Sequence, residues 1–131
     1  MRKHLKRLRK NQKGSQTLEF VAVFPLIIFA FLFIWQMALV SYAIVVTEAA
    51  ARDGARAASV DGDYVQAVQS SAVGLDIVGT PGRSISESSY GQEVTVTVVT
   101  KVPMVQMPFV RNLDQNVTST ATMPYEVDED D

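Results

Sequence analysis

The feature that most constrains this chain is a long stretch without charge. Residues 20–46 contain 27 amino acids, and the only polar interruptions are Gln36 and Ser41. As a helix this stretch would measure roughly 40 Å at 1.5 Å per residue, while the hydrocarbon core of a bilayer is about 30 Å thick. A soluble protein would need a large core to bury such a helix, and the rest of a 131-residue chain can hardly provide one. The stretch therefore predicts a single membrane span.

The charges on either side of the span predict its orientation. Seven of the twelve basic residues lie in residues 2–13, and no acidic residue precedes Glu19. The remaining five basic residues share the rest of the chain with all 14 acidic ones. Because basic residues are retained on the cytoplasmic side, the N-terminus is expected in the cytoplasm and the C-terminal part outside. The basic cluster would also favour anionic lipid.

An ordinary secretory signal is the alternative interpretation of this N-terminus. Ala49 and Ala51 offer a weak A-x-A cleavage pattern. However, such signals have an apolar core of about 7–15 residues, and the stretch before these alanines is far longer. The pattern favours an anchor over a released signal.

The cytoplasmic end of the span carries a distinctive junction. A basic leader ends at Gly14, four uncharged residues follow, and Glu19 is a single acid before the apolar stretch. This arrangement resembles the processing signal of type IV prepilins. The resemblance implies that a prepilin peptidase cleaves between Gly14 and Ser15, leaving Glu19 as the fifth residue of the mature chain.

Physical chemistry supports that spacing. Glycine lets an extended backbone enter a protease cleft without a side chain in the way. Cleavage would create an amino cation at Ser15, one helical turn from Glu19. A carboxylate near hydrocarbon is costly unless paired, so the amino terminus of a neighbouring subunit is the expected partner. The simpler alternatives are that Gly14 is a loop glycine and that Glu19 complements the helix dipole.

Two further stretches narrow the resemblance. Pro25 follows Glu19 by six residues, and residues 46–58 read VTEAAARDGARAA. Both are similar to the TadE-like family, in which an AAR-x-GAR-x-A stretch lies just outside the membrane. This chain has one extra alanine before Arg52, and Asp53 stands where glutamate is common. The similarity is specific over residues 14–58, about a third of the chain.

The resemblance implies a minor pseudopilin of a Tad (tight adherence) pilus or a related secretion machine. The implied partners are a prepilin peptidase, other pilins or pseudopilins, the pilus assembly platform and membrane lipid. Pro25 removes one helical hydrogen bond and should kink or loosen the helix near Val21. Membrane helices tolerate this for structural reasons, and a flexible point used when the subunit leaves the bilayer is the functional alternative.

The segment after the span predicts a continued helix to about Ser59. Glu48 and Arg52, and Asp53 and Arg56, are spaced to pair on a solvated helix face. Small residues recur every four positions and would let another backbone approach closely. This stripe packs either on the chain's own sheet, which we favour, or on a neighbouring pilin; its members are Ala50, Gly54 and Ala58.

The second half of the chain predicts a small head. Asp63 is placed as the N-cap of a second helix that ends near Gly74, with Val65, Val68 and Ala72 facing the core.

Three strands are predicted next, over 83–89, 92–102 and 116–123, with a hairpin turn at residues 90–91. Alternation in the second strand predicts that one face is buried, through Val94, Val96 and Val98.

Two C-terminal segments stand apart from these elements. Residues 103–108, with Phe109, form an apolar loop that is either a contact surface for a partner or part of the core. An acidic tail closes the chain at residues 128–131 and is expected to be solvated.

Enzymatic chemistry finds little support in this composition. His4 is the only histidine and lies in the leader, and there is no cysteine. The usual triads and zinc sites are therefore excluded from a cleaved chain. Asp61 and Asp63 alone do not make a cation site, and the basic cluster beside a membrane span is not expected to bind nucleic acid. We expect no catalytic, cofactor or metal site, and a protein that is the substrate of an enzyme.

The overall expectation is an α+β chain with a long N-terminal transmembrane helix that continues outside the membrane, then a short helix and an antiparallel sheet of about three strands. The predicted division is a leader (1–14), the helix (15–59), an extracytoplasmic head (60–125) and an acidic tail (126–131). Two other functions stay open, an unprocessed single-pass anchor with a binding head and a secreted protein. They predict mature chains that start at Met1 or Arg2 and near Arg52, respectively, against Ser15 for a processed pilin-like subunit.

Overall fold

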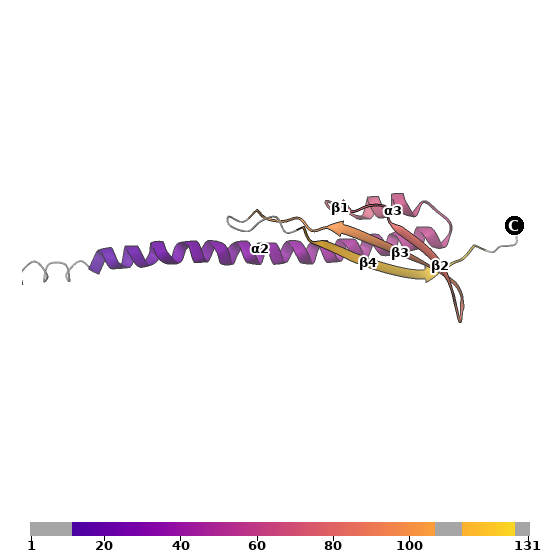
Figure 1. Ribbon diagram of the computed structural model, residues 1–131, viewed down its shortest axis with the longest axis horizontal. Coiled ribbons are helices and arrows are strands. Elements are labelled where there is room, and N and C mark those ends of the chain that lie inside the picture. The colour runs from indigo at the N-terminus through magenta and orange to yellow at the C-terminus, as the bar shows by residue number, and fades with distance from the viewer. Residues whose placement is uncertain (1–11, 107–113, 128–131) are drawn as a thin grey trace, which may run out of the picture. The chain divides into compact units, whose positions relative to one another are not determined.

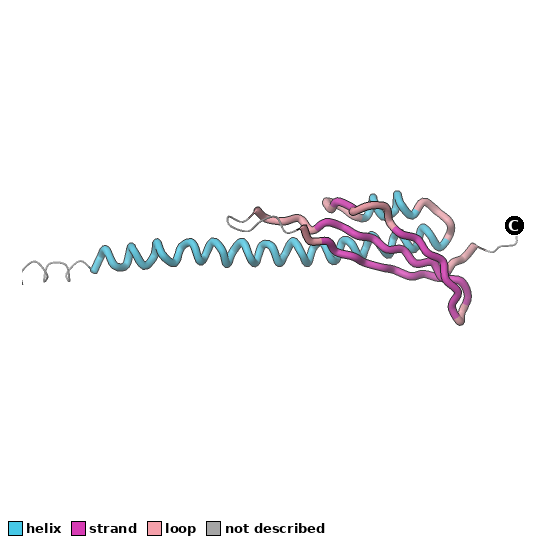
Figure 2. Tube along the Cα trace, viewed as in Figure 1, coloured by secondary structure: helices cyan, strands magenta, loops and turns pink. Residues whose placement is uncertain are grey.

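The computed structural model describes residues 12–106 and 114–127 (Figures 1 and 2). Contacts divide the chain into two compact units, Met1–Trp35 and Gln36–Asp131. The predicted α+β architecture is confirmed: a long apolar helix, a short helix and a small antiparallel sheet. Two of the expectations, the basic leader before Gln12 and most of the acidic tail, lie outside the described residues, as do Met107 and Phe109 of the apolar loop.

Helix α2 runs over Gln12–Ser59, with Pro25 inside it. It ends at the residue that the sequence predicted and begins three residues before the predicted start at residue 15. The end is built by a turn in which Asp61 adopts a left-handed backbone conformation with φ of 56°. Gly62 N donates to Ala57 O at 2.8 Å and Asp61 N to Ala58 O at 3.2 Å. This pairing is a Schellman motif, which satisfies the last carbonyls of the helix.

The first unit consists of the N-terminal part of α2. Its side chains from residue 14 to residue 35 are exposed, except for the half-buried Leu32. The helix over Gly14–Ser59 is long and apolar enough to cross a membrane, and its most apolar window buries nothing within the protein. Helices that are apolar all round are typical of membrane spans.

The second unit contains the rest of α2 and the head. Helix α3 covers Tyr64–Ser71, and the carboxylate of Asp63 accepts a hydrogen bond from Gln66 N at 3.0 Å. The predicted N-cap is therefore confirmed. Val68 is buried and Val65 half-buried, whereas Ala72, also buried, lies just past the end of the helix.

Four strands form the sheet, one more than the sequence predicted. They are β1 (Asp76–Ile77), β2 (Gly82–Ser88), β3 (Gly91–Lys101) and β4 (Asn116–Pro124). Strand β3 is central: β2 and the short β1 pair with its two ends, β4 pairs along it, and all pairs are antiparallel. Figure 1 shows β3 and β4 beside the second half of α2. The predicted turn after β2 is present, with Gly91 at φ of 124°.

One face of β3 forms the main core with the two helices. Val94, Val96 and Val98 are fully buried, as the alternation predicted. They pack with Val68, Ala72 and four alanines of α2, namely Ala50, Ala51, Ala55 and Ala58. A second cluster lies nearer Gln36 and joins Ala43, Leu75 and Val102. The second half of α2 is thus a core element of the head.

Candidate functional site: the start of α2 and its small-residue stripe

The predicted processing site lies on the exposed first turns of α2. Gly14 and Ser15 are both helical and exposed, and beyond the adjacent helix backbone nothing in the described residues lies within 4 Å of the position that a side chain on Gly14 would take. Glu19 is exposed and one turn beyond Ser15, so the two residues share a helix face. No ion pair is recorded for Glu19 among the side chains from residue 14 onward that the structure describes.

The helical state of Gly14 bears on how a protease would reach it. Proteases bind extended backbone, so the first turn of α2 would have to open before cleavage. Glycine lowers helix stability by roughly 1 kcal/mol relative to alanine, and helix ends open at low cost. The position of Gly14 near the start of the helix makes that opening easier.

The small-residue stripe is buried against the head of its own chain. Ala50 and Ala58 are fully buried, and Gly54 is buried as well. A side chain on Gly54 would begin 2.5 Å from Cγ2 of Val68 and 3.1 Å from Cγ1 of Val96. Of the two alternatives for this stripe, packing on the chain's own sheet agrees with these contacts.

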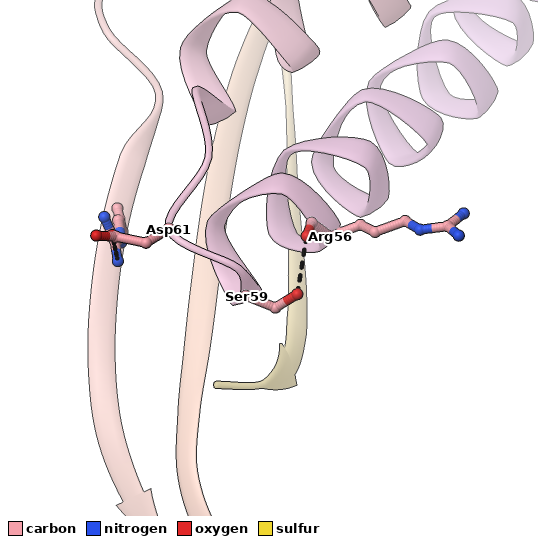
Figure 3. A network of polar contacts seen from close by, with 4 residues as sticks. Arg56, Ser59 and Asp61 are labelled. Carbon is pink, nitrogen blue, oxygen red and sulfur yellow. Dashed lines mark hydrogen bonds and ion pairs between the residues drawn. The ribbon is translucent and has the colours of Figure 1, made fainter. Parts of the chain in front are cut away.

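The charged face of the same segment is exposed. Arg52 pairs with Glu48, as their spacing predicted. Asp53 instead accepts a hydrogen bond from Ser71 Oγ on α3, and no pair with Arg56 is recorded in the described part of the chain. Figure 3 shows the Arg56 side chain extending away from Asp61, while Arg56 O accepts a hydrogen bond from Ser59 Oγ at 2.8 Å. Arg56 also lines an open pocket of about 490 Å³ with Met123, Pro124 and Glu126.

Sequence reasoning missed an aromatic clamp at the end of α2. The Arg83 guanidinium lies 5.9 Å from the ring centre of Tyr64 and 5.8 Å from that of Tyr125, and it pairs with Asp61 at 2.8 Å. The hydrogen bond from Arg83 to Asp61 raises the pKa of Arg83 above its ordinary value. Rings on a guanidinium add cation–π attraction. The clamp holds the turn between α2 and α3. Nothing in the sequence indicated that these distant residues would be in contact.

A second missed feature is Gln36. Its side chain is only 8% exposed, although it lies in the apolar stretch. Its Nε2 donates to Pro103 O at 3.3 Å, and its Oε1 accepts from Val105 N at 2.9 Å. The one sequence signal for these contacts was the presence of an isolated polar amide in an otherwise apolar segment.

Metal ligands do not gather within the described residues: no group of three or more His, Cys, Asp or Glu side chains there could hold an ion. Asp61 and Asp63, a pair that the sequence did not predict to bind a cation, contact other groups. Asp61 pairs with Arg83, and Asp63 caps α3.

Together these features define a class of protein in which one helix is long and apolar enough to cross a membrane and also forms part of the core of a small α+β head. The family model described as TadE-like protein matches residues 14–56. The matched segment begins at Gly14 and includes Glu19, Pro25 and the small-residue stripe as far as Gly54. No curated protein and no solved structure gave a match to the chain. The chain is therefore similar to TadE-like proteins over about a third of its length, within helix α2.

Proposed function

We propose that this chain is a minor pseudopilin, processed by a prepilin peptidase and used in assembling a Tad pilus or a related secretion or adhesion machine. One observation carries the proposal: the TadE-like match begins at Gly14, where an exposed glycine and Glu19 open a long apolar helix. The basic leader supports an N-terminus in the cytoplasm and a head outside. The role is structural, and the expected partners are other pilins and the assembly platform.

Gly14→Leu should block removal of the leader. A branched side chain at the residue before the scissile bond would obstruct a cleft that accepts glycine. Intact-mass measurement of membrane-extracted protein reports the result directly: the parent should lack residues 1–14, and the variant should retain them. Gln16→Leu is the matched control, because it adds the same side chain on an exposed helix position and should still be shortened.

A parent chain that keeps Met1 would favour the unprocessed single-pass anchor with a binding head. Equal shortening of the parent and the Gly14→Leu variant would remove the prepilin interpretation, because the side chain at Gly14 would then be irrelevant.

Glu19→Gln should separate processing from assembly. The hypothesis is that the Glu19 carboxylate pairs with an amino group created by cleavage, either its own or that of an adjacent subunit. The substitution keeps the shape of the side chain and removes the charge, so cleavage after Gly14 should continue. Mature protein should then stay in the membrane without joining its pilin partners, as measured by crosslinking and co-purification.

Glu48→Gln is the control for this experiment, since it also removes one carboxylate from an exposed face of α2. It should lose only its pair with Arg52, an exposed i,i+4 contact worth about 0.3–0.5 kcal/mol. If Glu19→Gln associated with partners as well as the parent does, only a helix-dipole role of about 0.3–1 kcal/mol would be left for Glu19.

A further inference from the structure

Gln36 is unusual because its side-chain amide lies in an apolar helix, yet its nitrogen and its oxygen both bond to the head. Its Nε2 donates to Pro103 O at 3.3 Å and lies 3.2 Å from Met104 Sδ, and its Oε1 accepts from Val105 N at 2.9 Å. These partners lie 67 to 69 residues further along the chain. The amide therefore holds one specific segment of the head, residues 103–106, which we call the foot.

The foot is uncharged, and two of its backbone groups bond to the Gln36 side chain. Pro103 O and Val105 N bond to Gln36, and the adjoining Val102 N donates to Gln115 O at 2.9 Å. Met104 packs on the second core cluster. The nearest charged residue before the foot is Lys101, which precedes Val102 and pairs with Asp114 at 2.8 Å. An uncharged segment thus lies next to a charged pair.

Length along α2 places Gln36 near the outer edge of a bilayer. About 20 helical residues cross the hydrocarbon core, and counted from Phe20 they end at Leu39. Gln36 then lies about one turn inside that end. Met37 and Tyr42 on the same helix are 48% and 44% exposed, so the apolar surface continues past Gln36. Tyrosine is enriched at the boundary between lipid and water.

We propose that the foot rests in the outer leaflet, with the lipid surface as its ligand and Gln36 as its positioning residue. In lipid, irregular backbone is tolerated only where its polar groups find partners within the protein, and the Gln36 amide supplies two of them. In water, the backbone of such a loop would form these hydrogen bonds with solvent instead. The inference rests on the membrane anchoring of α2 and not on pilus assembly.

Continuity with the apolar span favours lipid over a second protein as the occupant. Exposed apolar side chains of α2 continue past Gln36 without a charge as far as Val45. The part of α2 that bonds to the foot therefore presents apolar side chains to its surroundings on its other faces.

Because the sequence contains no cysteine, a single introduced cysteine can be labelled at one chosen position. Gln106→Cys, Phe29→Cys and Tyr90→Cys, each in the full chain, receive an environment-sensitive NBD label in phosphatidylcholine vesicles. Phe29 is an exposed residue of the span, and Tyr90 is 98% exposed at the β2–β3 turn. The Gln106 probe should be quenched by lipids that carry a spin label high on the acyl chain, and only weakly by iodide. The Tyr90 probe should show the reverse.

A second pair of variants tests the positioning role. Gln36→Leu, combined with the Gln106→Cys probe, should increase iodide quenching several-fold, because the foot loses its two bonds to the amide. Ser41→Leu is the matched control: Ser41 is the other polar residue of the stretch, but its hydroxyl bonds only to Met37 O within α2. It should leave the probe in lipid, and the Tyr90 probe should not change in either variant.

Iodide quenching at Gln106 as strong as that at Tyr90 would overturn the proposal. Protection of Gln106 from both quenchers, increasing with protein density, would show that a second copy of the chain covers the foot, and it would overturn the proposal too. An unchanged probe in Gln36→Leu would remove the positioning role. If the Phe29 probe also failed to contact lipid, the membrane anchor itself would be wrong.

Discussion

Val96→Asp is expected to unfold the head. Val96 is fully buried at the centre of β3, and its Cγ1 reaches toward Gly54 of α2. A carboxylate there would lie without a partner among apolar side chains, which costs several kcal/mol. Small domains are stable by only about 5–15 kcal/mol. The urea dependence of protease resistance, measured on the full chain in detergent, should show the variant digested at concentrations that the parent head survives.

Thr97→Asp is the matched control, since it places the same charge on the next residue of β3. Thr97 is half-buried on the opposite face, where its hydroxyl lies 3.4 Å from that of Thr120. This variant should keep most of the parent's resistance. A Val96→Asp head that resisted digestion as well as the Thr97→Asp head would mean that β3 does not bury the face that we assign to it.

Gly54→Leu should be similarly disruptive, through volume instead of charge. A first side-chain carbon at this position would already lie 2.5 Å from Val68 Cγ2 and 3.1 Å from Val96 Cγ1. Both valines are fully buried in the main core, so a shift of either side chain would disturb its neighbours. Overpacking of this kind costs about 3 kcal/mol, which exceeds the gain of roughly 1 kcal/mol from replacing a helical glycine. The same protease assay should show early unfolding.

Ala49→Leu tests whether added volume alone is harmful, because Ala49 lies on the exposed face of the same helix; it should be tolerated. A double-mutant cycle sharpens the assignment. Gly54→Ala and Val68→Ala should each destabilise the head, and together they should cost less than the sum, because the shortened valine makes room for the new methyl group. Strict additivity would show that the two residues do not touch.

The sequence predicted the elements whose pattern is local and repeated. The alternation of valines identified β3 and its buried face, and the position of Asp63 before an apolar stripe identified the start of α3. In both cases the burial depends on a spacing that the chain itself displays. The four-residue recurrence of Ala50, Gly54 and Ala58 likewise indicated a close approach of backbones, and it favoured the chain's own sheet over a neighbouring pilin as the contact.

The features that were missed depend on contacts between distant residues. Strand β1 has only two residues, Asp76 and Ile77, too few to show any alternation, and it exists because the end of β3 is free to pair. Arg83 meets Tyr64 and Tyr125 only after the sheet has formed. Gln36 was visible as an exception in an apolar stretch, but its partners could not be read from its neighbours in the sequence.

The alanines and the glycine that α2 contributes to the core have a consequence for modularity. A fragment that begins after Ser59 would lack Ala50, Gly54 and Ala58, and the valines of β3 would face water. The head therefore cannot be exchanged between anchors by recombination at the end of the helix. A graft that preserves it would have to carry the chain from Gln36 onward, so any new anchor can replace only the part of the helix that precedes this residue.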